Sequence, residues 1–303
     1  MQPRHFASVV TAATLWGFGG VLGTMLSRHS DLGSMSIAMW RMLVAGAALL
    51  LYLAVRRALR PLPGPAWRRA LLTGALTALF EACFFSAIPY SSVGLATLIG
   101  IGSAPVCVAL WDWAHGRQRP SAATLGALVL ALGGLALLLG GSLDAGGGGP
   151  LGPLLALGAG ASFAAISVVN RTPVDGLGPV EHTAVAFTWG GLLLVPAAAL
   201  AGIAGPATLG GVGAPSDAYG WALTLGMGVV VTALAYVLYL GGLRTVPPFV
   251  ATIVSLLEPL VAAILAAFVF GERLGWAGIG GGAALAAAIV LLRPQRDEPE
   301  SIH

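Results

Sequence analysis

Long hydrophobic runs, separated by short polar breaks, make up most of this chain. A helix needs about 20 apolar residues to cross the hydrocarbon core of a bilayer. The breaks are rich in Gly, Pro, Ser and Arg, which is typical of turns. The pattern predicts ten membrane-spanning helices, at residues 7–26, 34–55, 67–88, 92–114, 121–140, 151–170, 180–201, 218–241, 247–270 and 275–292. We therefore expect an all-α integral membrane protein.

Composition supports this class. Of the 303 residues only 9% are charged, and the mean hydropathy is +0.89. A soluble chain usually carries about 25% charged residues, so most of the outer surface must face lipid. The 44 glycines suit close packing between membrane helices.

The arginines predict the orientation, because Lys and Arg concentrate on the cytoplasmic side of membrane proteins. The chain has 15 arginines and no lysine. With a cytoplasmic N-terminus, the outer loops hold Arg28 and Arg273, and Arg41 lies within a span. The other twelve fall on the inner side: Arg4, Arg56, Arg57, Arg60, Arg68, Arg69, Arg117, Arg119, Arg171, Arg244, Arg293 and Arg296. We therefore expect both termini in the cytoplasm.

An internal repeat divides the spans into two groups of five. ATLIGIGSAPVCVAL at 96–110 corresponds to ATIVSLLEPLVAAIL at 251–265, and Pro105 corresponds to Pro259. An odd number of spans inverts the second unit in the membrane, and inverted repeats are characteristic of secondary transporters.

The repeat predicts four parts of the chain. They are a first repeat at 1–141, a Gly-rich linker at 142–150, a second repeat at 151–293 and a cytoplasmic tail at 294–303.

Glu258 and Pro259 stand near the middle of the ninth predicted span. A charge at this depth is costly and marks a functional site by default. Proline removes a backbone hydrogen bond, and the freed carbonyl is tolerated only against protein or a wet cavity. Glu258 is thus a candidate for substrate or proton contact; a buried structural hydrogen bond or ion pair is the alternative. Pro105 and Pro259 are predicted to break their helices at the cavity.

Glu81 and Arg41 are the other charged candidates, both in the outer halves of their spans. Glu81 could carry a proton, bind a substrate amine, or pair with Arg41. Arg41 could be structural or could bind a substrate carboxylate.

Three aromatic residues complete the candidate set. Trp16, Tyr236 and Tyr239 lie inside spans, where packing is the ordinary role. Over a cavity they could instead stack on an apolar or cationic substrate.

No enzyme motif is present in the sequence: HExxH, GxSxG and the Walker A pattern are all missing. Cys83 and Cys107 have no partner at metal-ligand spacing, and the arginines form no basic stripe. We expect no catalytic residue, metal, cofactor or nucleic-acid partner. The remaining classes are a transporter and, against this pattern, a membrane enzyme or scaffold.

Residues 255–292, SLLEPLVAAILAAFVFGERLGWAGIGGGAALAAAIVLL, closely resemble the last two helices of EamA-type carriers of the drug/metabolite transporter superfamily. These carriers show LEP, a hydrophobic span, GERL and a Gly-containing helix. Leu15-Trp16-Gly17, Arg41 and Ala104-Pro105 fit the first unit of such carriers. FEACFFSAIPYSS, at 80–92, is similar to the third helix of the aromatic amino-acid exporters of the superfamily.

The resemblance implies ten helices in two inverted repeats around a central cavity. It also implies export of small metabolites, often amino acids, across a bacterial plasma membrane, coupled to protons or another gradient. A multidrug or cationic-compound exporter is the alternative within transport.

The chain departs from the family pattern in three places. GRQR at 116–119 replaces a full GER motif, Ala104 stands where the second unit has Glu258, and Phe163 stands where the family often has tryptophan. A symmetric pair of acidic sites is therefore absent. Without lysine, the sugar-phosphate and nucleotide-sugar branches are disfavoured.

Overall fold

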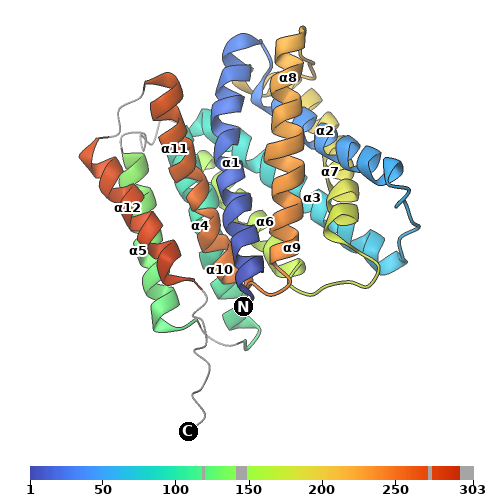
Figure 1. The fold of residues 1–303 in the computed structure, drawn as a ribbon. Coiled ribbons are helices and arrows are strands. Elements are labelled where there is room, and N and C mark those ends of the chain that lie inside the picture. Colours follow the sequence, from blue (N-terminus) through green and yellow to red (C-terminus); the bar gives the residue numbers. More distant parts are fainter. Residues whose placement is uncertain (118–119, 141–148, 272–274, 294–303) are drawn as a thin grey trace.

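The computed structural model describes residues 1–117, 120–140, 149–271 and 275–293, and within these ranges the chain forms helices and loops but no strand (Figure 1). The expected tail at 294–303 lies outside the described residues, and so does the expected linker apart from its last two positions, 149 and 150. Arg119, Arg273 and Arg296, used above for orientation, also lie outside them.

The first half of the chain forms long helices close to the predicted spans. They are α1 (Pro3–His29), α2 (Ser34–Val55), α3 (Gly64–Ala87), η1 (Ile88–Tyr90), α4 (Val93–Ala114) and α5 (Ala122–Leu139). Local chemistry sets some of the starts. Ser92 caps α4 and Ser121 caps α5, each accepting a hydrogen bond from a backbone N–H of the first turn.

The second half contains more interruptions. Its elements are α6 (Leu151–Val169), α7 (Pro179–Ala204), η3 (Ala207–Leu209), α8 (Ala218–Gly226), η4 (Met227–Leu234), α9 (Ala235–Gly242), α10 (Pro248–Ser255), α11 (Leu257–Phe270) and α12 (Trp276–Leu291). Across the described residues, nine helical segments are long and apolar enough to cross a membrane, and α12 is a shorter apolar helix of 16 residues.

One interruption is a change of winding. Between α8 and α9 the chain continues as a π-helix, η4, so the segment from Ala218 to Gly242 is one continuous rod with a wider middle. Four consecutive β-branched residues, 229–232, lie in this stretch. Such side chains crowd the preceding turn of an α-helix.

The other interruption separates α10 from α11 at Leu256, three residues before Pro259. The break expected at Pro105 is not observed: α4 runs through Pro105 without interruption. A proline removes one helix hydrogen bond but does not by itself end a membrane helix that neighbours support. α4 has such support from α6, α5 and α10.

The helices pack around α1, which contacts α8, η4, α9, α10 and α11. In Figure 1, α5 and α12 lie together at one edge of the bundle, and α2, α3 and α7 lie on the other side. At the α5–α12 contact, Gly134 and Gly281 each face the backbone of the other helix so closely that a Cβ atom would overlap it. Small residues thus bring these backbones together.

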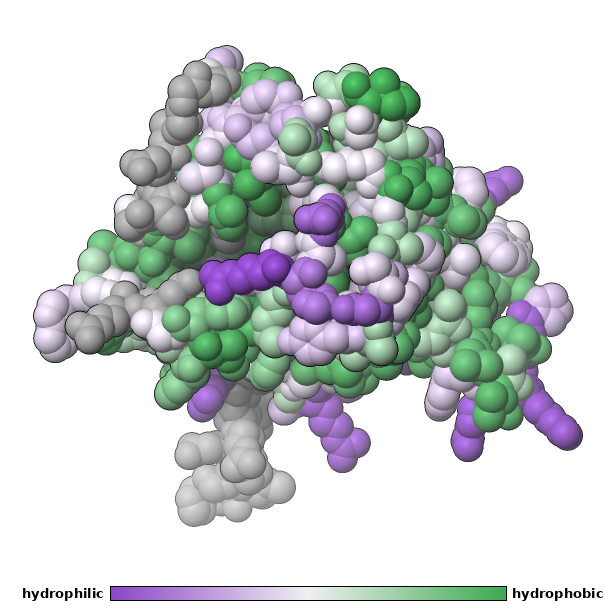
Figure 2. Space-filling view, turned by 90° about the horizontal axis from the view of Figure 1, so that it is seen from above, coloured by the Kyte–Doolittle hydropathy of each residue, from purple (hydrophilic) through white to green (hydrophobic). Residues whose placement is uncertain are grey.

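The outer surface is apolar, as a lipid-facing surface requires. Trp276 is 89% exposed, and Phe268 and Ile203 are each 84% exposed. Seen from above in Figure 2, hydrophobic residues dominate the flanks and strongly hydrophilic residues occupy fewer positions. Burial of polar groups inside this bundle therefore needs its own explanation.

Candidate functional site

A buried ion pair joins α2 and α3. Arg41 Nη2 donates to Glu81 Oε1, and the Glu81 side chain is 1% exposed. Of the three alternatives given for Glu81, the structure contains the pair with Arg41. The pair uses only part of each group, because Arg41 Nε and Glu81 Oε2 are buried without a hydrogen-bond partner among the described residues.

Glu258 lies in the first turn of α11, directly after the break at Leu256. Its side chain is half-buried, and within the described part of the chain no hydrogen bond or salt bridge to it is found. Arg41 and Glu81 both lie within electrostatic range of its carboxylate. The structure therefore brings the three charged candidates into one cluster, contributed by α2, α3 and α11.

Helix α1 covers this cluster through Gly17. A Cβ atom at Gly17 would lie 2.5 Å from Val261 Cβ and 2.9 Å from the carbonyl oxygen of Glu258. The close approach presses the middle of α1 against the start of α11.

Trp16 is buried in an aromatic group. Its ring centroid lies 5.0 Å from that of Tyr236, 5.1 Å from Tyr239 and 5.9 Å from Phe163. Phe187 lies 4.5 Å from Tyr236 on the side of α7. The sequence-based candidates Trp16, Tyr236 and Tyr239 thus contact one another, in tilted and edge-on arrangements that aromatic pairs prefer.

Tyr236 connects the aromatic group to the charges, because Glu81, Arg41 and Glu258 all act on it electrostatically. Tyr239 has a different surrounding: its hydroxyl is hydrogen-bonded to Ser167 Oγ at 2.7 Å, and the ring is fully buried. We call Trp16, Arg41, Glu81, Tyr236 and Glu258 the central cluster.

Five buried polar atoms lack a hydrogen-bond partner among the described residues. They are Trp16 Nε1, Arg41 Nε, Glu81 Oε2, Ser103 Oγ and Thr232 Oγ1. Leaving a buried polar group unpaired costs about 1–3 kcal/mol, so such groups are rare and need an explanation. Three of the five belong to the central cluster, which is the pattern expected of a site that a polar ligand completes.

Sequence reasoning missed Thr232, Ser103 and Ser167. Their hydroxyls give no signal in an apolar helix, where a serine or threonine ordinarily bonds to its own backbone. The β-branched run 229–232 was the available sign of irregular winding around Thr232.

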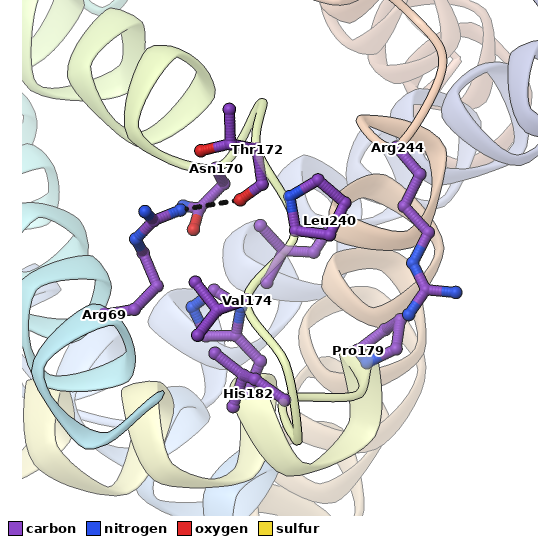
Figure 3. Close-up of a pocket in the computed structure, with 10 residues that line it drawn as sticks. Arg69, Asn170, Thr172, Val174, Pro179, His182, Leu240 and Arg244 are labelled. Atoms are coloured by element: carbon purple, nitrogen blue, oxygen red, sulfur yellow. Dashed lines mark hydrogen bonds between the residues drawn. The ribbon is translucent and has the colours of Figure 1, made fainter. Parts of the chain in front are cut away.

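A small pocket lies elsewhere, at the ends of α3, α6 and α7 that the arginine count predicts to be cytoplasmic. It has a volume of about 30 Å³, and Arg69 and Arg244 lie on opposite sides of it (Figure 3). This volume has room for a water molecule or two and not for a metabolite.

Several polar groups of that pocket are hydrogen-bonded to one another or to backbone. Thr73 Oγ1 is hydrogen-bonded to His182 Nε2 at 2.9 Å and to Asn170 Nδ2 at 3.0 Å. Arg69 donates to the carbonyl oxygens of Val169 and Thr172. These bonds tie α3 to the end of α6 and to α7, so the pocket is a structural junction.

No group of three or more potential metal ligands is found among the residues the structure describes. Cys83 and Cys107 are both free thiols. The arrangement offers a membrane-buried cluster of one cation, two carboxylates and aromatic rings. Such a combination, inside a bundle of apolar helices, defines a multi-pass membrane protein with an intramembrane polar site.

The chain belongs to the EamA-like transporter family, whose model matches residues 6–140 and 150–293. It is 32% identical over 278 residues to the uncharacterized transporter YwfM of Bacillus subtilis (strain 168), covering 89% of this chain and 88% of that protein. It is 29% identical over 213 residues to an uncharacterized transporter of Archaeoglobus fulgidus, covering 70% of this chain and 72% of the relative.

A solved crystal structure shares the fold with a TM-score of 0.75, at 17% identity and with 96% of each chain covered. The family and the names of the relatives indicate a transporter rather than an enzyme. The family resemblance stated from the sequence is therefore confirmed.

Proposed function

We propose that this protein is a secondary transporter of the bacterial plasma membrane that exports small metabolites, amino acids or related compounds, by alternating access. The observation that carries the proposal is the central cluster. It contains a cation and two carboxylates inside an apolar bundle, and polar atoms on Trp16, Arg41 and Glu81 have no hydrogen-bond partner in the described ranges.

The cluster suits a ligand that carries both charges. A substrate carboxylate would accept a hydrogen bond from Arg41 Nε, which has no partner among the described residues, since guanidinium groups bind carboxylates well. A substrate ammonium would lie against Glu258, which has no salt bridge among the described residues. Glu258 is also our candidate for proton coupling, because a carboxylate without a fixed cation can exchange a proton and a ligand.

Ten spans in two inverted five-helix repeats are part of the proposal. The first unit would be 1–141 and the second 151–293, joined by the linker 142–150 and followed by the tail 294–303. In this scheme α1–α5 correspond in order to α6, α7, the α8–α9 rod, the α10–α11 pair and α12.

The helix packing supports that correspondence. Exchanging the units turns the α3–α6 contact into the contact of the α8–α9 rod with α1, and turns α4–α6 into the contact of α10–α11 with α1; both contacts exist. The contacts α2–α7 and α5–α12 map onto themselves, as contacts on a two-fold axis do. In inverted-repeat transporters, the substrate site lies where the units meet at the midplane.

A second candidate function is export of cationic or multidrug compounds. It is favoured by the ring surfaces of Trp16 and Tyr236 beside two carboxylates, because aromatic faces and acids both attract cations. The two candidates differ in whether the Arg41 guanidinium is used by the ligand.

Flux measured in proteoliposomes tests the proposal. Purified protein is reconstituted with an equimolar mixture of radiolabelled L-amino acids inside, and efflux is compared with that of a lipophilic quaternary ammonium cation. Efflux of amino acids faster than from protein-free vesicles supports the first candidate, whereas efflux of the cation alone supports the second. Absence of both fluxes contradicts the transport proposal.

A pH gradient across the same vesicles tests the coupling. Proton coupling requires that acidifying one side change the efflux rate at constant substrate. Equal rates with and without the gradient would remove the proton from the mechanism and leave transport itself in place.

A further inference from the structure

Thr232 differs from other threonines in these helices. A threonine inside a helix usually bonds its hydroxyl to the carbonyl four residues earlier. Thr224, on the same rod, donates to Gly220 O at 2.8 Å, and Thr252 donates to Pro248 O at 2.9 Å. Thr232 Oγ1 is buried and has no hydrogen-bond partner within the described residues.

The π-helix explains why. Thr232 lies within η4, where backbone bonds join residues five apart and the turn is wider. The residue therefore no longer stands over the carbonyl of Gly228 as it would in an α-helix. π-helical turns inside α-helices occur frequently at functional sites.

Two neighbours of Thr232 place it beside the central cluster. Gly228, one turn earlier, lies against α2, where an added Cβ would be 3.1 Å from the carbonyl oxygen of Arg41. Tyr236, one turn later, is within electrostatic range of Arg41 and Glu81 and contacts Trp16. The segment that carries Thr232 therefore packs on α2 close to the backbone of Arg41. Element η4 as a whole contacts both α1 and α2.

Taken with the proposed function, on which this inference rests, we propose that Thr232 is a substrate-binding residue whose hydroxyl donates a hydrogen bond to an oxygen of the substrate. In this proposal the oxygen belongs to the carboxylate held by Arg41, whose Nε is another buried donor without a hydrogen-bond partner among the described residues. In the π-helical turn the Thr232 hydroxyl does not bond to the helix backbone, so it can donate to the substrate. The amine end of the substrate then points to Glu258, on the opposite side of the cluster.

The proposal predicts opposite effects on stability and on transport. Thr232→Val keeps the shape and removes a hydroxyl that has no hydrogen-bond partner among the described residues. The unfolding temperature in detergent should therefore stay constant or rise. The half-saturating concentration of the radiolabelled amino-acid mixture should rise about 10- to 100-fold, the range for one hydrogen bond to a charged group.

Three further variants make the comparison specific. Thr232→Ser keeps the hydroxyl and should retain a half-saturating concentration near that of the wild type. Thr224→Val removes a hydroxyl that is bonded to the backbone of the same rod, so it should lower the unfolding temperature and leave half-saturation unchanged. Thr232→Ala repeats the hydroxyl deletion with a smaller side chain should the valine variant fail to fold.

The outcomes separate this inference from the transport proposal. If the wild-type protein transports amino acids and Thr232→Val, or Thr232→Ala, has the same half-saturating concentration, the proposed role of Thr232 is wrong and the transport proposal is unaffected. Equal weakening by Thr224→Val also overturns it. A wild-type protein without flux of either class of compound overturns the proposed function, and the inference falls with it.

Discussion

Arg41 of α2 and Glu81 of α3 form an ion pair inside the membrane-embedded bundle, through one nitrogen of the guanidinium and one oxygen of the carboxylate. The other carboxylate oxygen and Arg41 Nε are buried without a partner in the part of the chain that the structure describes. A pair built only for stability would be expected to satisfy these atoms, since an incompletely bonded buried pair stabilises little. The pair thus links α2 and α3 but leaves one donor and one acceptor unsatisfied among the described residues.

A double-mutant cycle measures how much the interaction between Arg41 and Glu81 contributes to the free energy of unfolding. Arg41→Met or Glu81→Met alone leaves one unpaired charge inside the bundle and should lower the free energy of unfolding by about 3–5 kcal/mol. The double variant should lose clearly less than the sum. Reversible unfolding in mixed detergent micelles provides the free energies, and additive losses would show that the two side chains act independently.

Glu258→Gln tests the carboxylate that has no hydrogen bond or salt bridge in the described structure. Glutamine has nearly the same shape, so the unfolding temperature should remain that of the wild type. Efflux of the labelled amino acids should fall to the level measured with protein-free vesicles, because a neutral amide neither pairs with an ammonium nor carries a proton.

Asp175→Asn is the matched control for that variant, since Asp175 is an exposed acid in the loop between α6 and α7. It should transport as the wild type does. Wild-type efflux in Glu258→Gln would reduce Glu258 to a structural residue, and so would loss of folding in that variant.

Gly17→Ala tests the contact of α1 with α11. The new Cβ would meet Val261 and the Glu258 carbonyl at distances shorter than van der Waals contact. We expect a loss of about 1–3 kcal/mol in the free energy of unfolding, the usual cost of overpacking, together with slower efflux because the start of α11 is displaced.

Gly20→Ala, one turn further along the same face of α1, is its control. A Cβ there would approach Ala262 Cβ only to 3.4 Å, which is at the edge of ordinary contact. Equal stability losses in the two variants would indicate that alanine disturbs α1 itself and not its packing on α11.

The hydrogen bonds of Asp217 lead us to expect that the stability of the protein depends on pH. It caps α8 by accepting a hydrogen bond from the N–H of Gly220 at 2.7 Å, and it accepts a second from His29 Nε2 at 2.6 Å. The Gly220 bond, and then the His29 bond, lower the pKa of the Asp217 carboxyl below its ordinary value. A group with a lowered folded-state pKa stabilises the protein above its unfolded pKa, and the stabilisation disappears as the pH falls through the folded value.

Asp217→Ala should therefore lower the unfolding temperature at pH 7, and the gap to the wild type should close as the pH falls below about 3.9, the ordinary pKa of aspartate. Asp31→Ala, in the exposed loop between α1 and α2, should show no such gap. A gap for Asp217→Ala that is the same at every pH would contradict the lowered pKa.

More of the fold than of the candidate site could be predicted from the sequence. The helices begin and end within a few residues of the predicted spans, such as Ser34–Val55 for 34–55 and Val93–Ala114 for 92–114. Span length is set by hydropathy and bilayer thickness, which are local properties of the sequence. The sequence also supplied the candidates Glu258, Glu81, Arg41, Trp16, Tyr236 and Tyr239, because charges and lone aromatics in apolar spans are rare.

What the sequence determined by itself is therefore the all-helical membrane class, the family and a short list of intramembrane polar residues. Only the tertiary structure decided which of them meet. Whether Glu81 pairs with Arg41, and whether Tyr236 faces the charges, depends on the rotation of each helix about its axis, which is fixed by packing against helices distant in sequence. The same holds for the two prolines: α4 is held by its neighbours through Pro105, whereas the chain breaks before Pro259. The Thr232 hydroxyl, which has no partner among the described residues, lies in the π-helical turn of η4, which packs on α1 and α2; this winding is not visible in the hydropathy pattern.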